Sequence, residues 1–134
     1  MRRLALMSCA LLAMAGASTA DSAPNGLLSA DEIRAEFLGT RMSGVQLSTS
    51  EKFVECIEPG GRSIFQLGDI YSEGSMAVTP KGEACFTYSS GTYCYRIQRV
   101  PKGYMIRSVD SSGVFHVRAI ERNVTQCKAD DLIG

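Results

Sequence analysis

Short runs of apolar and aromatic residues, separated by turn-forming residues, make up most of the chain after Gly39. Within many of these runs apolar and polar positions alternate, which is typical of strands with one buried and one solvated face. No helical period recurs in this part of the chain. The pattern predicts eight strands, near residues 41–47, 52–57, 63–67, 75–79, 83–88, 93–100, 104–109 and 114–120.

The turns between these strands are short and use proline and glycine. Pro80-Lys81-Gly82 and Pro101-Lys102-Gly103 share one pattern, with proline at the second turn position and glycine where a positive φ is needed. Such closely spaced turns favour an up-and-down antiparallel meander, and the missing alternation of strands and helices argues against an α/β fold. We expect a mainly β fold, either a barrel or a strongly curved open sheet. Residues 66–74 contain two glycines and fit a long loop, over the mouth if the sheet is a barrel.

One short helix is predicted before the strands. Ser29 and Glu32 have the spacing of a capping box. Leu28 and Ile33 occupy the two positions of a hydrophobic staple around the same helix start. The helix is expected to span residues 30–38 and to pack its apolar stripe across one end of the sheet.

The segment 82–100 reads as a β-hairpin with two distinct faces. A tight turn that places Tyr88 opposite Gly91 would make Cys85 and Cys94 direct cross-strand neighbours. A four-residue loop would leave the two cysteines on one face but diagonal. The core face is expected to carry Ala84, Phe86, Tyr88, Tyr93, Tyr95 and Ile97.

The N-terminus has the features of a secretory signal peptide. Two arginines precede an apolar run at residues 4–17, and small residues follow up to Ala20. The run is too short to span a membrane. We therefore expect a cleaved signal at residues 1–20, no membrane span, and a single periplasmic or secreted domain at residues 21–134.

Cleavage would remove Cys9 and leave four cysteines. An even number in a small exported domain argues for two disulfides, and the chain lacks any Cys-x-x-Cys spacing and has a single histidine, which argues against a metal site. Three connectivities are allowed. We favour Cys85–Cys94 within the hairpin and Cys56–Cys127 between an early strand and the tail, because the second pairing ties a trailing end to the body.

Composition and charge give little support to nucleic-acid binding or catalysis. Without two signal-peptide arginines, the formal net charge is about −2, from 12 basic and 14 acidic residues. His116 lies in a predicted strand and is interpreted as a surface or rim residue. The carboxylate pairs Glu55 with Glu58 and Asp69 with Glu73 are not distinguished by spacing from solvated strand faces. No enzyme activity, cofactor or metal is expected.

Aromatic residues are concentrated on the core face of the hairpin. A tyrosine there has an apolar ring and a hydroxyl that needs a partner, which suits either the edge of a core or a polar-lined ligand cavity. The hairpin residues of this cluster are Phe86, Tyr88, Tyr93 and Tyr95, and Tyr104 on the next strand is a further candidate member.

Two functions fit these features. The first is a carrier of a small apolar or amphipathic ligand, held inside the barrel by Tyr88, Tyr93 and Tyr95. The second is an inhibitor or virulence-type host-interaction factor that binds a protein partner. It would use the Ser89–Thr92 loop, with Ser89 and Ser90, together with the basic strands that follow.

Two resemblances bear on these expectations. The helix start Leu28–Ile33, Cys85 and the pair Cys94-Tyr95 resemble a family of small exported alphaproteobacterial β-proteins, most of them uncharacterised, and imply a fold and a compartment more than an activity. The segment Tyr88–Tyr93 is similar to the Ser-rich loop and aromatic strand of periplasmic inhibitors of c-type lysozyme, which are eight-stranded barrels. That likeness implies that Ser89 or Ser90 inserts into the partner.

Overall fold

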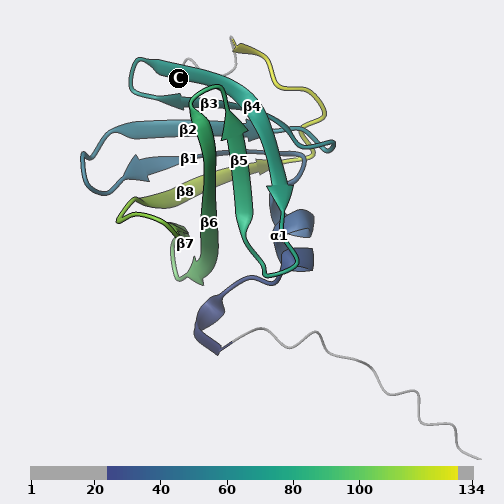
Figure 1. Ribbon diagram of the computed structural model, residues 1–134, viewed down its shortest axis with the longest axis vertical. Coiled ribbons are helices and arrows are strands. Elements are labelled where there is room, and N and C mark those ends of the chain that lie inside the picture. The colour runs from purple at the N-terminus through teal and green to yellow at the C-terminus, as the bar shows by residue number, and fades with distance from the viewer. Residues whose placement is uncertain (1–23, 130–134) are drawn as a thin grey trace, which may run out of the picture.

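The computed structural model describes residues 24–129, so the predicted signal peptide at residues 1–20 lies outside the described residues. The described chain forms a closed barrel of eight antiparallel strands (Figure 1). Each strand pairs with the next along the chain, and the last pairs with the first. The prediction of a mainly β meander is confirmed, and of the two expected forms the structure has the barrel.

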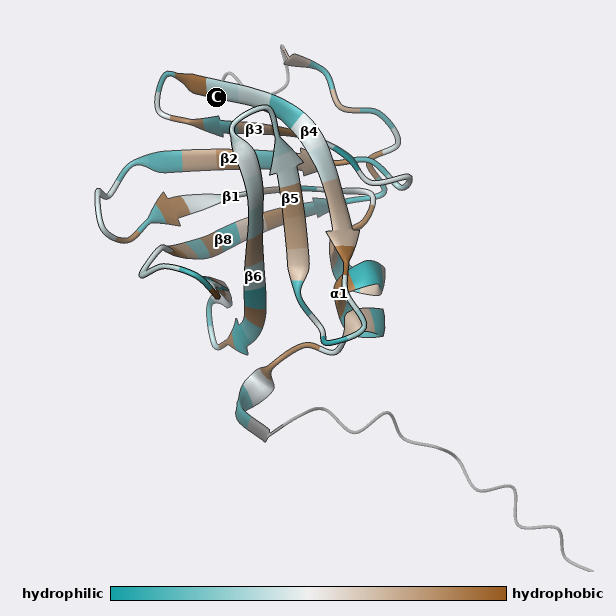
Figure 2. Cartoon of the chain, in the orientation of Figure 1, coloured by the Kyte–Doolittle hydropathy of each residue, from teal (hydrophilic) through white to brown (hydrophobic). Residues whose placement is uncertain are grey.

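The observed strands follow the predicted order, and most of their bounds shift by only one or two residues. Figure 2 shows hydrophilic and hydrophobic residues alternating along several of them, as expected for a barrel with its core inside. A short 3-10 turn, η1 (Pro24–Gly26), precedes the helix. The strands are β1 (Thr40–Gln46), β2 (Lys52–Ile57), β3 (Arg62–Leu67), β4 (Ile70–Val78), β5 (Ala84–Tyr88), β6 (Gly91–Val100), β7 (Gly103–Ser108) and β8 (Val114–Arg122).

Residues 66–74, expected as a long loop, belong to strands β3 and β4 except for a two-residue turn at residues 68–69, so this prediction was wrong. The chain reverses tightly at Gly68, which has a φ of +55°. Gly74 lies within β4, opposite Tyr88. A Cβ at Gly74 would lie only 2.1 Å from the Thr87 carbonyl oxygen and 2.6 Å from Cδ1 of Tyr88. This glycine therefore marks a close approach between two strands rather than a break in one.

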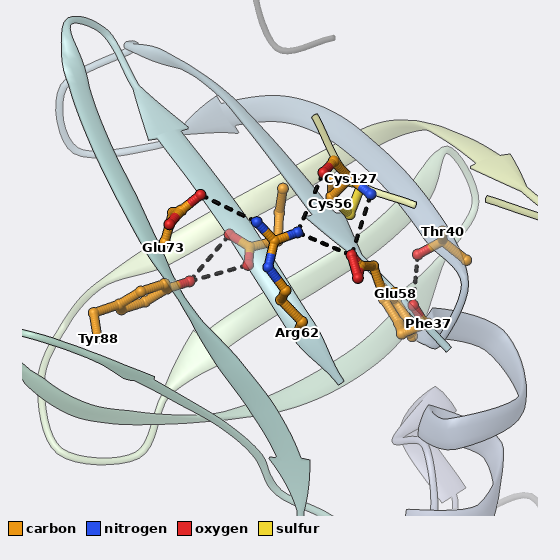
Figure 3. The surroundings of a disulfide bond; sticks show 9 residues. Phe37, Thr40, Cys56, Glu58, Arg62, Glu73, Tyr88 and Cys127 are labelled. Carbon is orange, nitrogen blue, oxygen red and sulfur yellow. Dashed lines mark hydrogen bonds and ion pairs between the residues drawn. A yellow bond between two sulfur atoms is a disulfide. The ribbon is translucent and has the colours of Figure 1, made fainter. Parts of the chain in front are cut away.

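Both disulfides that we favoured from the sequence are present. The β5–β6 turn has two residues, and it places Cys85 directly opposite Cys94, to which Cys85 is bonded. Cys56 is bonded to Cys127 in the C-terminal segment. This second bridge, drawn in Figure 3, lies beside Glu58 and Arg62. Its two cysteines pack with Ile64 in a small cluster separate from the main core.

The predicted helix is α1 (Ala30–Phe37), and it closes one end of the barrel (Figure 1). Its capping box is present, with Ser29 and Glu32 each bonding the backbone N–H of the other. Ile33 and Phe37 are completely buried in the core. The expectation that the helix packs across one end of the sheet is confirmed.

Polar contacts hold α1 to the barrel wall. The Tyr104 hydroxyl donates to Glu36 Oε2 at 2.8 Å, and the Arg122 guanidinium donates to the Glu36 carbonyl oxygen at 2.8 Å. Arg99 pairs with Glu36 and with Glu32. The buried side chains of α1 therefore fill this end of the barrel, and the polar contacts hold the helix in place.

Candidate functional site

The barrel interior is hollow away from α1. A cavity of about 250 Å³ lies there, and Ile70 and Ser90 in its lining place it near the β3–β4 and β5–β6 turns. Met42 and Ile106, both buried, lie on its core side. An apolar cavity of about 150 Å³ is large enough to hold benzene. This cavity is thus large enough for a bigger aromatic or aliphatic group.

The cavity walls are mainly aromatic. The ring of Phe115 lies edge-on to three neighbours, with centroid distances of 5.1 Å to Phe53, 6.1 Å to Phe65 and 6.0 Å to Tyr95. The ring of Tyr88 lies 6.0 Å from that of Phe65. These rings come from five strands, so the barrel gathers residues that are far apart in the sequence.

One carboxyl group, that of Glu55, belongs to this apolar lining. Glu55 has the same parity on β2 as the buried Phe53 and Ile57, and its side chain is only 3% exposed. The Tyr88 hydroxyl donates toward both carboxyl oxygens, at 3.0 and 3.1 Å. Figure 3 shows Tyr88 extending its hydroxyl between the strands of the barrel.

Burial governs the ionisation of this pair. It raises the pKa of Glu55 well above its ordinary value of 4.5, while the Tyr88 and Ser63 hydroxyls oppose the rise less strongly. Burial likewise raises the pKa of Tyr88 and of Tyr95, and the Glu55 carboxyl adds to both rises. The surroundings therefore favour the neutral acid at Glu55.

A second polar group lies close to Glu55. Ser63 on β3 is completely buried, and among the described residues its hydroxyl oxygen has no hydrogen-bond partner of ordinary geometry. Its influence on the pKa of Glu55 places it near the carboxyl group. Ser63 and Glu55 thus leave hydrogen-bonding capacity unused inside the barrel.

The mouth of the barrel carries exposed apolar side chains. Each of the large hydrophobic residues found exposed in the described chain lies at this end, in or next to one of the four turns there. The residues are Leu47, Ile70, Tyr71, Tyr93 and Val109.

The structure brings together most of the residues that the sequence suggested for a ligand site. Tyr88, Tyr93, Tyr95 and Ser90 all line the cavity. Ser89 does not line it, and it is exposed in the two-residue β5–β6 turn. The Tyr93 hydroxyl donates to Ser90 Oγ at 3.1 Å at the rim.

Two of the four carboxylates considered in the sequence pair with an arginine on the outside of the barrel. Glu58 lies away from Glu55 and pairs with Arg62 at 2.9 Å beside the Cys56–Cys127 bridge (Figure 3). Arg62 also pairs with Glu73 at 3.1 Å. These charges join the tail to the outer wall, and the sequence missed that Glu55 belongs to the interior instead.

The single histidine and one group of potential metal ligands each contact other parts of the protein. His116 is half-buried on β8, where Nε2 lies 3.2 Å from the Lys102 carbonyl oxygen. Glu83 lies beside Cys85 and Cys94, the one group of potential metal ligands found among residues 24–129. Metals bind cysteine as thiolate, and both sulfurs here are bonded to each other, so this group does not form a metal site.

Comparisons of the chain with protein-family models, with curated proteins and with solved structures gave no match. Among the described residues, no helix has the length and the apolar character needed to cross a membrane.

Proposed function

We propose that the protein is a non-enzymatic binding module that holds a small, largely apolar ligand inside its barrel. The observation that carries this proposal is the aromatic cavity of about 250 Å³ at the end of the barrel that α1 does not fill. Small-molecule sites are typically concave and apolar, with a few polar groups that fix orientation. Here the Glu55 carboxyl group and the Tyr88 hydroxyl are such groups.

A location outside the cytoplasm would fit this function. Two disulfides in so short a chain are typical of proteins that work outside the cytoplasm. A carrier there must shield an apolar ligand from water, and a closed barrel does so without an exposed strand edge. The apolar residues at the mouth would give such a ligand a favourable path into the cavity.

The test uses a neutral probe of suitable size, 2-naphthalenemethanol, and measures its binding by titration calorimetry. A matched pair of variants on β4 separates the interior from the outer wall. Ser72→Phe fills the cavity that Ser72 lines, whereas Ser75→Phe adds the same ring to an exposed position three residues away. We expect Ser72→Phe to weaken binding by at least about tenfold and Ser75→Phe to change it by less than about twofold.

Equal binding by both variants, or no binding to the wild-type protein, would contradict the proposal. Circular dichroism on each variant checks that the barrel remains folded.

A second candidate function is binding of a protein partner at the mouth of the barrel. It is favoured by the exposed apolar side chains around the β5–β6 turn, including Tyr93, and by Ser89 at its exposed tip. The likeness to inhibitors of c-type lysozyme makes that enzyme the first partner to test. Under this candidate function the protein inhibits lysozyme, and Ser89→Ala weakens inhibition while binding of 2-naphthalenemethanol is unchanged.

A further inference from the structure

The described cavity lining contains one carboxyl group, that of Glu55, and no basic side chain. No lysine, arginine or histidine occurs among the described residues that line the cavity, whereas Glu55 does. The groups that face the carboxyl group are Tyr88 from β5, Tyr95 from β6 and Ser63 from β3. A buried carboxylate normally pairs with a cation, and within the described chain none is provided.

The surrounding rings favour positive charge. The face of an aromatic ring carries partial negative charge and attracts ammonium groups, and rings grouped around one point form the cages that bind methylated amines. Phe53, Phe65, Tyr88 and Phe115 supply such rings from four strands. The same walls disfavour anions, because no cationic side chain occurs among the described lining residues and an ionised Glu55 would repel a second negative charge.

The carboxyl group can accept a further hydrogen bond. Tyr88 supplies one hydroxyl proton to its two oxygens, and an ionised carboxylate has about four acceptor positions. Glu55 belongs to the cavity lining, and Tyr88, whose hydroxyl bonds its carboxyl group, lines the same cavity. An ammonium group bound in the cavity would therefore find both an acceptor and a counter-charge.

We propose that the cavity selects organic cations, namely amines with an apolar body, and that the charged nitrogen binds beside Glu55. This inference rests on the proposed function, since it names the class of ligand for the same cavity. The apolar body packs against the phenylalanine rings, as a neutral ligand would. The amine adds a charge-assisted hydrogen bond to the Glu55 carboxylate.

Binding of an amine also moves a proton. In the empty cavity burial favours the neutral acid, and a cation beside the group offsets that effect. Glu55 then ionises, and its proton passes to the buffer, while the bound ammonium keeps its own. A neutral ligand of the same shape leaves the carboxyl group protonated and releases no proton.

The experiment compares naphthalen-2-ylmethanamine with 2-naphthalenemethanol, which differ only in the amino and hydroxyl groups. Titration calorimetry between pH 5 and 8, in buffers of different ionisation enthalpy, gives the affinity and the number of protons released. We expect the amine to bind the wild-type protein at least about tenfold more tightly than the alcohol at the upper end of this range. Up to one proton should be released per amine, most at pH values between the pKa of Glu55 in the complex and its raised pKa in the empty cavity, and none per alcohol.

Two variants complete the test. Glu55→Gln should weaken amine binding by about tenfold or more and abolish proton release, and it should weaken alcohol binding by a clearly smaller factor than amine binding. Asp69→Asn is the control, because it makes the same carboxyl-to-amide change in an exposed turn at the mouth. It should leave both ligands unaffected.

The outcomes separate the two proposals. Binding of the alcohol with no preference for the amine would overturn the cation inference and leave the proposed function standing. The cation inference would also be overturned if the preference for the amine survives Glu55→Gln. It would likewise be overturned if Asp69→Asn reduces that preference as much as Glu55→Gln does. Failure of both ligands to bind would contradict the proposed function and this inference together. Proton release by the wild-type protein decides the question even if a variant does not fold.

Discussion

Glu55 is inside the barrel because of its position on β2 rather than its chemistry. Alternate residues of a strand point to the same face, so Glu55 is carried inward with Phe53 and Ile57. The hydrogen bond from Tyr88 offsets part of the cost of burial. Residues of this kind that are costly to bury are often retained for binding.

Replacing Glu55 by glutamine should make stability less dependent on pH. Between the ordinary pKa of 4.5 and the raised pKa, the folded protein keeps a proton that the unfolded chain has released. The free energy of unfolding of the wild-type protein therefore falls relative to Glu55→Gln as pH rises above 4.5. The slope is at most about 1.4 kcal/mol per pH unit, and it ends once Glu55 ionises in the folded state. Urea unfolding of both proteins from pH 4 to 8 measures it.

Parallel stability curves over this range would show that Glu55 has an ordinary pKa in the folded protein. A variant of the exposed Asp69, Asp69→Asn, gives the response to loss of a carboxyl group on the surface.

The sequence located the tyrosines of the site but not its acid. Tyr88, Tyr93 and Tyr95 were predictable because the hairpin pattern assigns them to one face. Sequence spacing does not distinguish Glu55 from a residue on a solvated strand face, and charged side chains are rarely buried. Its alternation with Phe53 and Ile57 was the signal that could have found it.

At the scale of the element, the hydrophobic pattern of the sequence predicted only the second half of β4. Gly74 looks like a loop residue in sequence, but it is the point where β4 passes closest to β5. That contact pairs residues from two strands, and their register depends on the β3–β4 and β4–β5 turns. Local propensity therefore predicted a loop where tertiary packing requires a strand.

Gly74→Ala should destabilise the protein by about 1–3 kcal/mol, the usual cost of forcing extra atoms into a packed site. The added methyl group would meet the Thr87 carbonyl oxygen at 2.1 Å, and backbone cannot move aside cheaply. Gly60→Ala is the matched control, because nothing lies within 4 Å of a Cβ there. It should change stability by less than about 0.5 kcal/mol in urea unfolding. Similar losses for both variants would contradict the assigned close approach.

At the scale of the molecule, closure of the barrel was the feature that the sequence could not decide. The short turns predicted eight neighbouring strands, but closure depends on β1 meeting β8 across the whole chain. That pairing includes a register shift between Ser43 and Gly44. A Cβ at Gly44 would lie 1.8 Å from the His116 carbonyl oxygen, so the contact requires glycine.

The two ends of the closed barrel differ in structure, because one is packed by α1 and the other contains the cavity. The α1 end holds the completely buried Ile33 and Phe37 and the polar contacts of Glu36. The opposite end holds the cavity and the exposed apolar mouth. Changes to the covalent framework outside the cavity should therefore affect stability before they affect ligand binding.

The disulfides test this division. Cys56–Cys127 spans 71 residues and Cys85–Cys94 spans 9. On the loop-entropy model, their removal costs about 4 and about 2.5 kcal/mol respectively, because the longer loop gains more freedom in the unfolded chain. We expect the double variant Cys56→Ser/Cys127→Ser to lose more stability in urea unfolding than Cys85→Ser/Cys94→Ser. While it remains folded, it should bind 2-naphthalenemethanol as the wild-type protein does, since neither cysteine lines the cavity. A larger loss from the hairpin bridge would mean that the β5–β6 hairpin, rather than the tail, limits unfolding of the barrel.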